Sequence, residues 1–204
     1  MTIEQIHPVL SAKLKGQAVG PRVLLDKLRL IDESSRKSSQ YQDPNYLPFY
    51  YHLGKLIQTK SLLHLGFNLG LPSCCFLQGC PSVERMLCFQ RSSKDFYSPR
   101  IAISNIRDIK GKNFLVDYHY GSVVDAEFIG KMSSSFDLIM VTEKVNGDKI
   151  KEDLEACWEY LNLDGFICVD HLADNKDVFS DFCKAKNRPF VIFNTRYGTG
   201  LAQK

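Results

Sequence analysis

Leu62-Leu63-His64-Leu65-Gly66-Phe67-Asn68-Leu69-Gly70 is the stretch that decides the fold of this 204-residue chain. It starts as a mostly apolar run, which is typical of a strand covered on both faces, and continues into a turn that contains two glycines. In open sheets of parallel strands, ligands bind beyond the carboxyl ends of the strands. The stretch therefore predicts a first core strand at residues 61–65, followed by a turn at a ligand-binding edge.

Short apolar runs and amphipathic segments alternate from this stretch to the C-terminus. Helices are predicted at 69–79 (as a helix or an irregular turn), 99–109, 123–131, 149–161 and 176–185, and strands at 61–65, 85–89, 113–118, 136–141, 165–169 and 189–193. Residues 197–202 either extend the last strand or pair with it. This alternation predicts an α/β fold, with a mostly parallel central sheet and helices on both faces.

The N-terminal third has a different pattern. Residues 1–33 are predicted to be helical, residues 34–46 to form a polar loop, and residues 46–58 to form an aromatic-rich helix. We expect residues 1–58 to be an N-terminal helical extension and residues 59–204 to be the α/β domain, the two forming one compact unit.

Composition narrows the functional classes. Hydrophobic residues make up 44% of the chain and charged residues 24%, which is ordinary for a globular protein. The net charge of +3 comes from scattered lysines and arginines, so we expect no nucleic-acid partner. No apolar run is long enough to span a membrane, and the first residues do not resemble a secretion signal, so we expect a cytoplasmic protein without a membrane partner.

The seven cysteines show no metal-binding spacing. No C-x-x-C pair occurs, and the spacing of Cys74, Cys75 and Cys80 does not suit zinc. An odd number of cysteines, most of them in apolar runs, favours buried reduced thiols.

The order of the elements resembles the class I S-adenosylmethionine-dependent methyltransferase family, from about Ser61 to the C-terminus. Four patterns carry the resemblance: the first strand and glycine turn, the fourth strand, the helix before the fifth strand, and the fifth strand with its leading turn and closing acid. These are residues 62–70, 136–141, 155–160 and 161–170. The resemblance implies a Rossmann-like fold, S-adenosylmethionine as cofactor, and N-terminal helices that act as a cap.

The resemblance also assigns cofactor-binding positions. The turn would receive the methionine part at Gly66, Asn68 and Gly70, and the loop after the third strand would receive adenine at Tyr120 and Gly121. Two positions depart from the family, which usually has an acid at the end of each of the first two strands. Here these positions hold His64 and Gln90. The amide of Gln90 can accept from ribose hydroxyls, though less strongly than a carboxylate.

Other features of the turn leave a choice open. Phe67 and Leu69 are bulky for a turn where backbone approaches a ligand, and we expect them to crowd the crevice. The glycines also fit a plain strand-to-helix turn, and His64 also fits a core histidine. Arg91 could instead meet a phosphate.

Asp170 and His171 follow the fifth strand, where the metal-dependent O-methyltransferases that this region resembles place cation ligands. Here Thr142 stands at the matching position after the fourth strand, which leaves a poor set of oxygen ligands for a hard cation, so we expect no metal. His171 could serve as a general base with Asp170 beside it. Alternatively, the pair caps the next helix or stabilises the loop.

Asp43-Pro44-Asn45-Tyr46 superficially resembles a motif of methyltransferases that act on DNA bases. It follows a polar loop instead of the fourth strand, so we interpret it as a turn. Together with the low net charge, this argues against a DNA methyltransferase.

The sequence leaves two main hypotheses. The first is an S-adenosylmethionine-dependent methyltransferase that acts on a small molecule at oxygen. The second, motivated by His64 and Gln90, is a non-catalytic protein of the same fold that binds a partner or forms a homo-oligomer. A nucleotide-binding protein that uses Arg91 for phosphate is a third, weaker reading.

Overall fold

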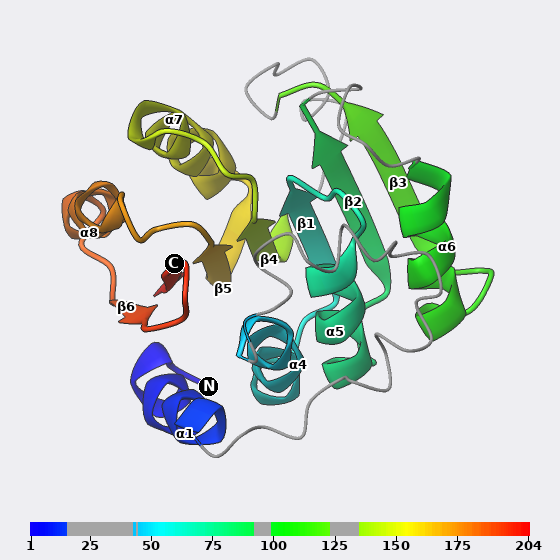
Figure 1. Ribbon diagram of the computed structural model, residues 1–204, viewed down its shortest axis with the longest axis horizontal. Helices are drawn as coiled ribbons and strands as arrows, with labels where there is room; N and C mark the ends of the chain where they lie inside the picture. Colours follow the sequence, from blue (N-terminus) through cyan, green and yellow to red (C-terminus); the bar gives the residue numbers. More distant parts are fainter. Residues whose placement is uncertain (16–42, 44, 92–98, 123–134) are drawn as a thin grey trace.

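The computed structural model describes residues 1–15, 43, 45–91, 99–122 and 135–204 (Figure 1). Its helices are α1 (Ile3–Lys15), α4 (Tyr46–Leu56), α5 (Leu71–Gly79), α6 (Pro99–Lys110), α7 (Gly147–Glu159) and α8 (Lys176–Ala185). Its strands are β1 (Ser61–Leu65), β2 (Arg85–Gln90), β3 (Leu115–Tyr120), β4 (Phe136–Val141), β5 (Leu161–Val169), β6 (Phe190–Phe193) and β7 (Thr199–Gln203). The helix expected at 123–131, most of the polar loop and the second half of the first helical segment lie outside the described residues.

The strands form one seven-stranded sheet in the order β3-β2-β1-β4-β5-β7-β6. The five strands from β3 to β5 run parallel, with β1 central between β2 and β4. β7 is antiparallel to both β5 and β6, so the last segment pairs with its neighbour as a separate strand. The predicted mostly parallel sheet is confirmed.

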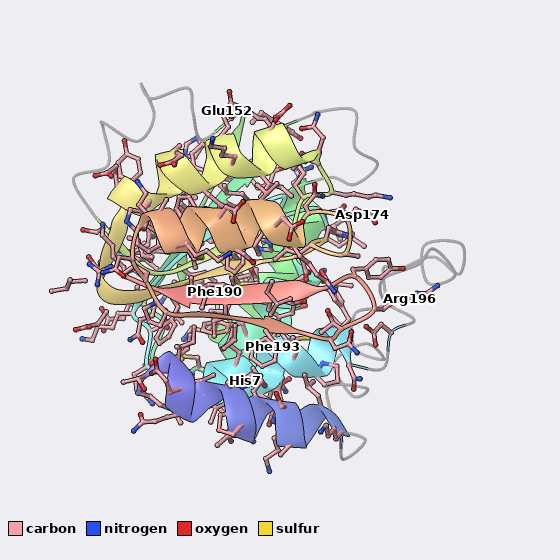
Figure 2. The ribbon with its side chains drawn as sticks, turned by 90° about the vertical axis from the view of Figure 1, so that its left-hand side faces the viewer. His7, Glu152, Asp174, Phe190, Phe193 and Arg196 are labelled. Carbon is pink, nitrogen blue, oxygen red and sulfur yellow. The ribbon has the colours of Figure 1, made fainter. Side chains whose placement is uncertain are left out.

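Helices cover both faces of the sheet. Successive residues of a strand point to opposite faces, so the apolar strands place side chains to be buried on each side. On β1, Leu62 belongs to the core cluster beneath α4, α5 and α6, and Leu63 belongs to the cluster beneath α7 and α8. Figure 2 shows α7 and α8 on one side of the sheet and α1 with α4 on the other.

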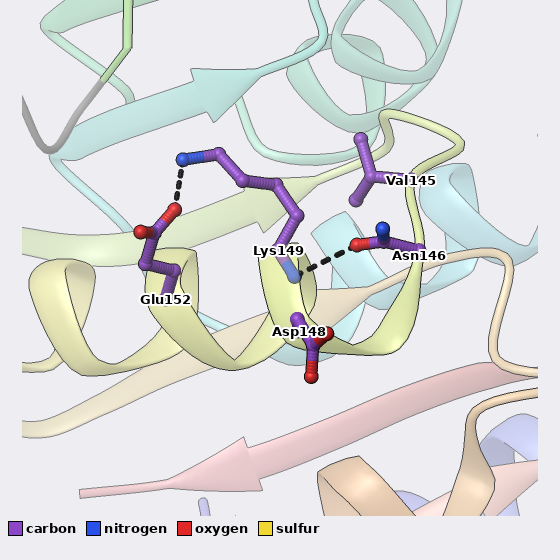
Figure 3. A pocket seen from close by; sticks show the side chains of 5 residues that line it. All are labelled: Val145, Asn146, Asp148, Lys149 and Glu152. Atoms are coloured by element: carbon purple, nitrogen blue, oxygen red, sulfur yellow. Dashed lines mark hydrogen bonds and ion pairs between the residues drawn. The ribbon is translucent and has the colours of Figure 1, made fainter.

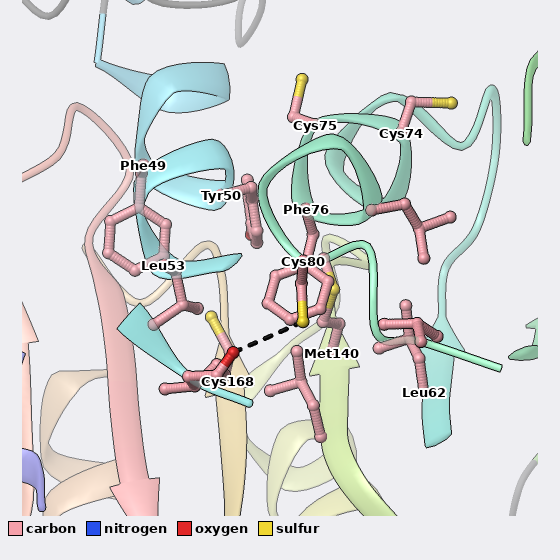
Figure 4. Close-up of a cluster of buried hydrophobic side chains, with 14 of the residues drawn as sticks. Phe49, Tyr50, Leu53, Leu62, Cys74, Cys75, Phe76, Cys80, Met140 and Cys168 are labelled. Atoms are coloured by element: carbon pink, nitrogen blue, oxygen red, sulfur yellow. Dashed lines mark hydrogen bonds between the residues drawn. The ribbon is translucent and has the colours of Figure 1, made fainter. Parts of the chain in front are cut away.

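The N-terminal helices share the first of these cores. Ile3, Ile6 and Leu10 of α1 are buried in it, together with the aromatic side chains of α4 (Figure 4). His7 of α1 also packs on Phe193 of β6, with ring centroids 5.4 Å apart (Figure 2). One continuous core joins the helical extension to the sheet, while the boundary between residues 58 and 59 stays a prediction.

Two glycines bring α4 and α5 into close contact. A Cβ atom on Gly54 would lie too close to the carbonyl of Phe76, and one on Gly79 too close to the carbonyl of Tyr51. The two helices therefore approach each other backbone to backbone, which places α4 firmly on the sheet.

Asp43 forms the predicted turn before α4. Its Oδ1 accepts a hydrogen bond from the backbone N–H of Asn45 at 2.9 Å, and its Oδ2 accepts from the N–H of Arg196 at 2.9 Å. This side-chain pattern is an Asx turn, so the interpretation of the segment as a turn is confirmed.

Several predicted boundaries were wrong. β3 starts two residues late, at Leu115, because the chain first turns at Gly111, whose carbonyl accepts from the N–H of Phe114. α4 ends at Leu56, two residues early. α7 starts and ends two residues early because Asn146 caps it, its side chain accepting from the N–H of Lys149 at 3.0 Å.

Leu161 belongs to β5 and not to the preceding helix. It pairs with Phe136, and a register shift between Phe136 and Leu138 lets the strand continue through Asp164, whose φ is +64°. The segment 161–164 looked like a turn because its exposed polar residues sit at an irregularity of the strand.

Candidate functional site

A small crevice lies at the carboxyl ends of the parallel strands, where the alternating pattern predicted a ligand site. It is lined by Leu65, Gly66, Phe89, Arg91, Gly121 and Glu143, and between these residues it has no space for even a water-sized molecule. Pockets for drug-sized ligands usually measure roughly 300–1,000 Å³. The crevice is therefore in the expected place but is narrow.

The turn after β1 needs its two glycines. Gly66 has a φ of +76°, and a Cβ atom there would lie 2.5 Å from the backbone nitrogen of Glu143. Gly70, with a φ of +70°, precedes α5, and a Cβ there would lie 2.8 Å from the Phe67 ring. Both positions exclude a side chain, which leaves backbone exposed to the crevice at Gly66.

Gln90 ties this turn to the neighbouring strands. Its side-chain oxygen accepts from the N–H of Asn68 at 2.8 Å, and its carbonyl accepts from the N–H of Gly121 at 3.0 Å. The structure thus brings together Gly66, Asn68, Gln90 and Gly121 as predicted from the sequence, with Gln90 supporting the turn.

Phe67 and Leu69 do not crowd the crevice, contrary to our expectation. Both are 1% exposed and belong to the core cluster on the α5 side of the sheet. The Phe67 ring packs against the rings of His64 and Tyr118, with centroids 5.4 Å and 5.8 Å away. The bulky residues of the turn face the core, since the turn itself presents its backbone to the crevice.

His64 is a core histidine and does not reach the crevice. It is fully buried, with Nδ1 2.5 Å from the Ser73 hydroxyl and Nε2 2.8 Å from the Thr142 hydroxyl. The Thr142 hydroxyl lies 3.0 Å from the carbonyl of Gly66, to which it donates, so it accepts from His64. Burial lowers the pKa of His64 to about 3, which keeps the ring neutral.

An ion-pair cluster closes the crevice. Nε of Arg91, directly after β2, lies 2.7 Å from Oε2 of Glu143, two residues after β4, and the guanidinium also pairs with Asp153 of α7. Burial raises the pKa of Asp153, and Arg91 opposes this rise. Two side chains of the loops thus narrow the crevice, and both are partly exposed.

Asp170 ends β5 and is buried among hydrogen-bond donors. Its Oδ2 accepts from the Tyr50 hydroxyl and its Oδ1 from the Thr199 hydroxyl, each at 2.7 Å. Burial raises the pKa of Asp170, and these hydrogen bonds partly offset the rise. Asp170 therefore links β5, β7 and α4.

His171, the next residue, has a φ of +58° and lies on Tyr197, with ring centroids 5.3 Å apart. Burial lowers the pKa of His171, with Asp170 opposing and Lys144 adding to the effect. Tyr120, by contrast, is 48% exposed at the end of β3, with its ring edge-on to Tyr118.

Other candidate chemistry is limited. Among the described residues, no group of three or more His, Cys, Asp or Glu side chains is placed to hold a metal ion. All seven cysteines are free and buried. No helix in the described part of the chain combines the length and apolarity needed to cross a membrane.

An open hollow of about 430 Å³ lies at the start of α7 (Figure 3), lined by Val145, Asn146, Asp148, Lys149 and Glu152. Asn146 caps the helix by accepting from the backbone N–H of Lys149, and the Lys149 side chain pairs with Glu152. We assign no chemistry to this hollow.

Asp153 is part of the site but was not predicted from the sequence. The sequence spacing could have revealed it, because Asp153 lies on the same buried face of α7 as Ile150, Leu154 and Cys157. A carboxylate on a buried helical stripe needs a partner, and Arg91 supplies it.

Comparisons with known proteins now bear on this geometry. The sequence matches no family model and no curated protein. The structure is similar to an O-methyltransferase from Bacillus cereus solved in complex with SAH, with 15% identity, 96% of each chain covered and a TM-score of 0.69. It is also similar to an SAH-bound methyltransferase from Podospora anserina, with 14% sequence identity and a TM-score of 0.67. The match covers 99% of this chain and 96% of the other.

A third similar structure is an O-methyltransferase from Streptomyces achromogenes involved in tomaymycin synthesis, solved in complex with SAM. Its sequence identity is 14%, the match covers 88% of each chain, and the TM-score is 0.65. This chain has the class I S-adenosylmethionine-dependent methyltransferase fold. At these identities the likeness establishes the fold, and the Rossmann-like architecture expected from the sequence is confirmed.

The class I methyltransferase fold implies S-adenosylmethionine, and the described residues allow a test of fit. The glycine turn, with Gly66 open to the crevice, suits a ligand that approaches the backbone. While Arg91 and Glu143 are paired across it, the crevice has no room for a ligand between its described residues. The glycine turn therefore suits the cofactor, and its binding would require these two side chains to separate.

Proposed function

We propose that this protein is an S-adenosylmethionine-dependent methyltransferase that acts on a small molecule at oxygen. The observation that carries the proposal is the crevice at the ends of β1, β2 and β4, edged by the glycine turn. The similar solved proteins include O-methyltransferases with SAM or SAH bound, which supports the same use of the fold here.

The cofactor would lie along this edge. Gly66, Asn68 and Gly70 would hold its methionine part, and Gln90, Tyr120 and Gly121 its adenosine part. S-adenosylmethionine supplies an activated methyl group on a sulfonium. The protein would contribute orientation and proximity between the methyl group and the acceptor oxygen, worth up to roughly 7–11 kcal/mol of the barrier when alignment is good.

His171 is the candidate general base of the proposal. Because burial lowers its pKa, the imidazole is neutral near pH 7 and can accept the proton of an acceptor hydroxyl. Asp170 would act as a positioning residue, since Tyr50 and Thr199 hold it rigidly beside His171.

A methyl-transfer assay tests this function. Labelled S-adenosylmethionine is incubated with a panel of small hydroxylated acceptors, and transfer to oxygen is measured. We expect His171→Gln to lower kcat by about 10²–10⁴, the usual contribution of a general base, with unchanged cofactor binding. Unchanged kcat in this variant would remove His171 from the mechanism, and transfer to no acceptor would count against the activity.

The alternative remains a non-catalytic protein of the same fold. Two observations favour it. Neither β1 nor β2 ends in an acidic residue, and the amide oxygen of Gln90 already accepts a hydrogen bond from the N–H of Asn68 in the turn. This alternative predicts no cofactor binding together with a stable partner or homo-oligomer. Light scattering combined with cofactor titration separates the two functions.

A further inference from the structure

Two side chains give the described lining of the crevice its charge. Arg91 and Glu143 pair across it at 2.7 Å with 20% and 17% of their side chains exposed, and the other lining residues are glycine, leucine or phenylalanine. Separating a partly buried ion pair is costly unless each charge finds a new partner. A ligand that enters must therefore supply replacements for both charges.

Asp153 can keep Arg91 in place when the pair separates. Its Oδ2 already pairs with the guanidinium, while its Oδ1 is buried and has no hydrogen-bond partner among the described residues. A planar guanidinium can donate two parallel N–H groups to one carboxylate. Arg91 can thus leave Glu143, bind both oxygens of Asp153 and still present further N–H groups to the crevice.

We infer that the Arg91–Glu143 ion pair is the element that recognises the α-amino acid group of the ligand, an inference that rests on the proposed function. The ligand's carboxylate accepts from Arg91, and its ammonium group donates to Glu143. This exchange replaces one ion pair with two and leaves no charge without a partner. A ligand with a single charge would leave one of the two side chains unmatched.

The position of Glu143 agrees with this assignment. A Cβ atom on Gly66 would lie 2.5 Å from the backbone nitrogen of Glu143 and 2.6 Å from its Cβ. Gly66 opens the turn expected to receive the methionine part, whose end is a zwitterionic amino acid. Glu143 thus supplies a carboxylate at an edge where the last residues of β1 and β2 include His64 and Gln90 but no acid.

Calorimetric titration with two ligands tests the inference on the full chain. S-adenosylhomocysteine carries the amino acid group, and 5′-methylthioadenosine has the same adenosyl thioether without it. We expect Glu143→Gln to weaken S-adenosylhomocysteine binding at least tenfold and to leave methylthioadenosine binding within about twofold. Glu143→Asp, which keeps the charge, should retain part of the affinity.

Glu152→Gln is the matched control, because it removes the same charge from the hollow at α7 and should change neither affinity. Thermal melting checks that each variant is folded. Equal losses for both ligands, or no loss for either in Glu143→Gln, would overturn the inference while leaving the proposed function in place. A wild-type protein that binds neither ligand would overturn both.

Discussion

At the scale of single residues, His64 shows how a polar side chain becomes part of the core. It occupies the position where the family usually has an acid, yet Ser73 and Thr142 satisfy both ring nitrogens in a fully buried site. A neutral histidine with two hydroxyl partners is compatible with burial, whereas a charged one is not.

The buried state of His64 predicts an acid-sensitive stability. Its pKa is about 3 in the folded protein against 6.5 for a free histidine, so the unfolded chain binds more protons between these values. The free energy of unfolding should therefore fall as the pH drops through this window, by up to about 1.4 kcal/mol per pH unit. Urea unfolding between pH 7 and about pH 4 measures the slope.

We expect His64→Gln to flatten this slope, because it removes the titrating group. His7→Gln, at an exposed position of α1 that contacts Phe193, removes a histidine elsewhere in the protein and provides the control. The account of His64 fails if its variant loses stability with acid as steeply as the wild type does.

Asp170 gives a second prediction at this scale. Tyr50→Phe removes one of the donors to the buried carboxylate while keeping the ring, and should lower the free energy of unfolding by about 1–3 kcal/mol at pH 7. Tyr51→Phe, a half-buried neighbour on the same helix, should cost less than about 0.5 kcal/mol. Similar losses of unfolding free energy in both variants would argue that the hydrogen bond from Tyr50 to Asp170 does not stabilise the fold.

At the scale of helices and strands, the clarity of the local hydrophobic pattern determined whether the sequence predicted the bounds of each element. β1, β4 and α8 match the prediction residue for residue, because a mostly apolar run or a clear amphipathic period marks each one. The bounds predicted for β3 were displaced because it is an edge strand whose partly exposed side chains mix apolar and polar residues. The meeting of Arg91, Glu143 and Asp153 was not predictable, since it joins three segments that only the tertiary fold brings together.

The close contact of α4 and α5 is testable at this scale. Gly54→Ala forces the helices apart, because its Cβ would overlap the carbonyl of Phe76, and should cost about 1–3 kcal/mol of stability despite the better helix propensity of alanine. Gln78→Ala, at an exposed position of α5, is the control. Chemical denaturation compares the two, and a stabilised Gly54→Ala would contradict the observed contact.

At the scale of the whole molecule, one core joins the helical extension to the sheet. Trp158, the single tryptophan, lies on α7 in the opposite core, so its fluorescence reports the face farthest from α1. We expect this fluorescence and the far-ultraviolet circular dichroism to change in one coincident unfolding transition.

Leu10→Ala, beneath α1, should lower both midpoints together and cost about 2–5 kcal/mol. An early loss of helical signal with the Trp158 transition unmoved would instead show that residues 1–58 unfold as a separate unit.

For the whole molecule, we propose that the crevice opens to hold S-adenosylmethionine. Calorimetric titration of the wild-type protein with S-adenosylmethionine and S-adenosylhomocysteine measures this binding. We expect saturable heat with one ligand per chain, after separation of Arg91 from Glu143. The absence of any binding heat at millimolar concentrations of both ligands would overturn the proposal and favour the non-catalytic protein.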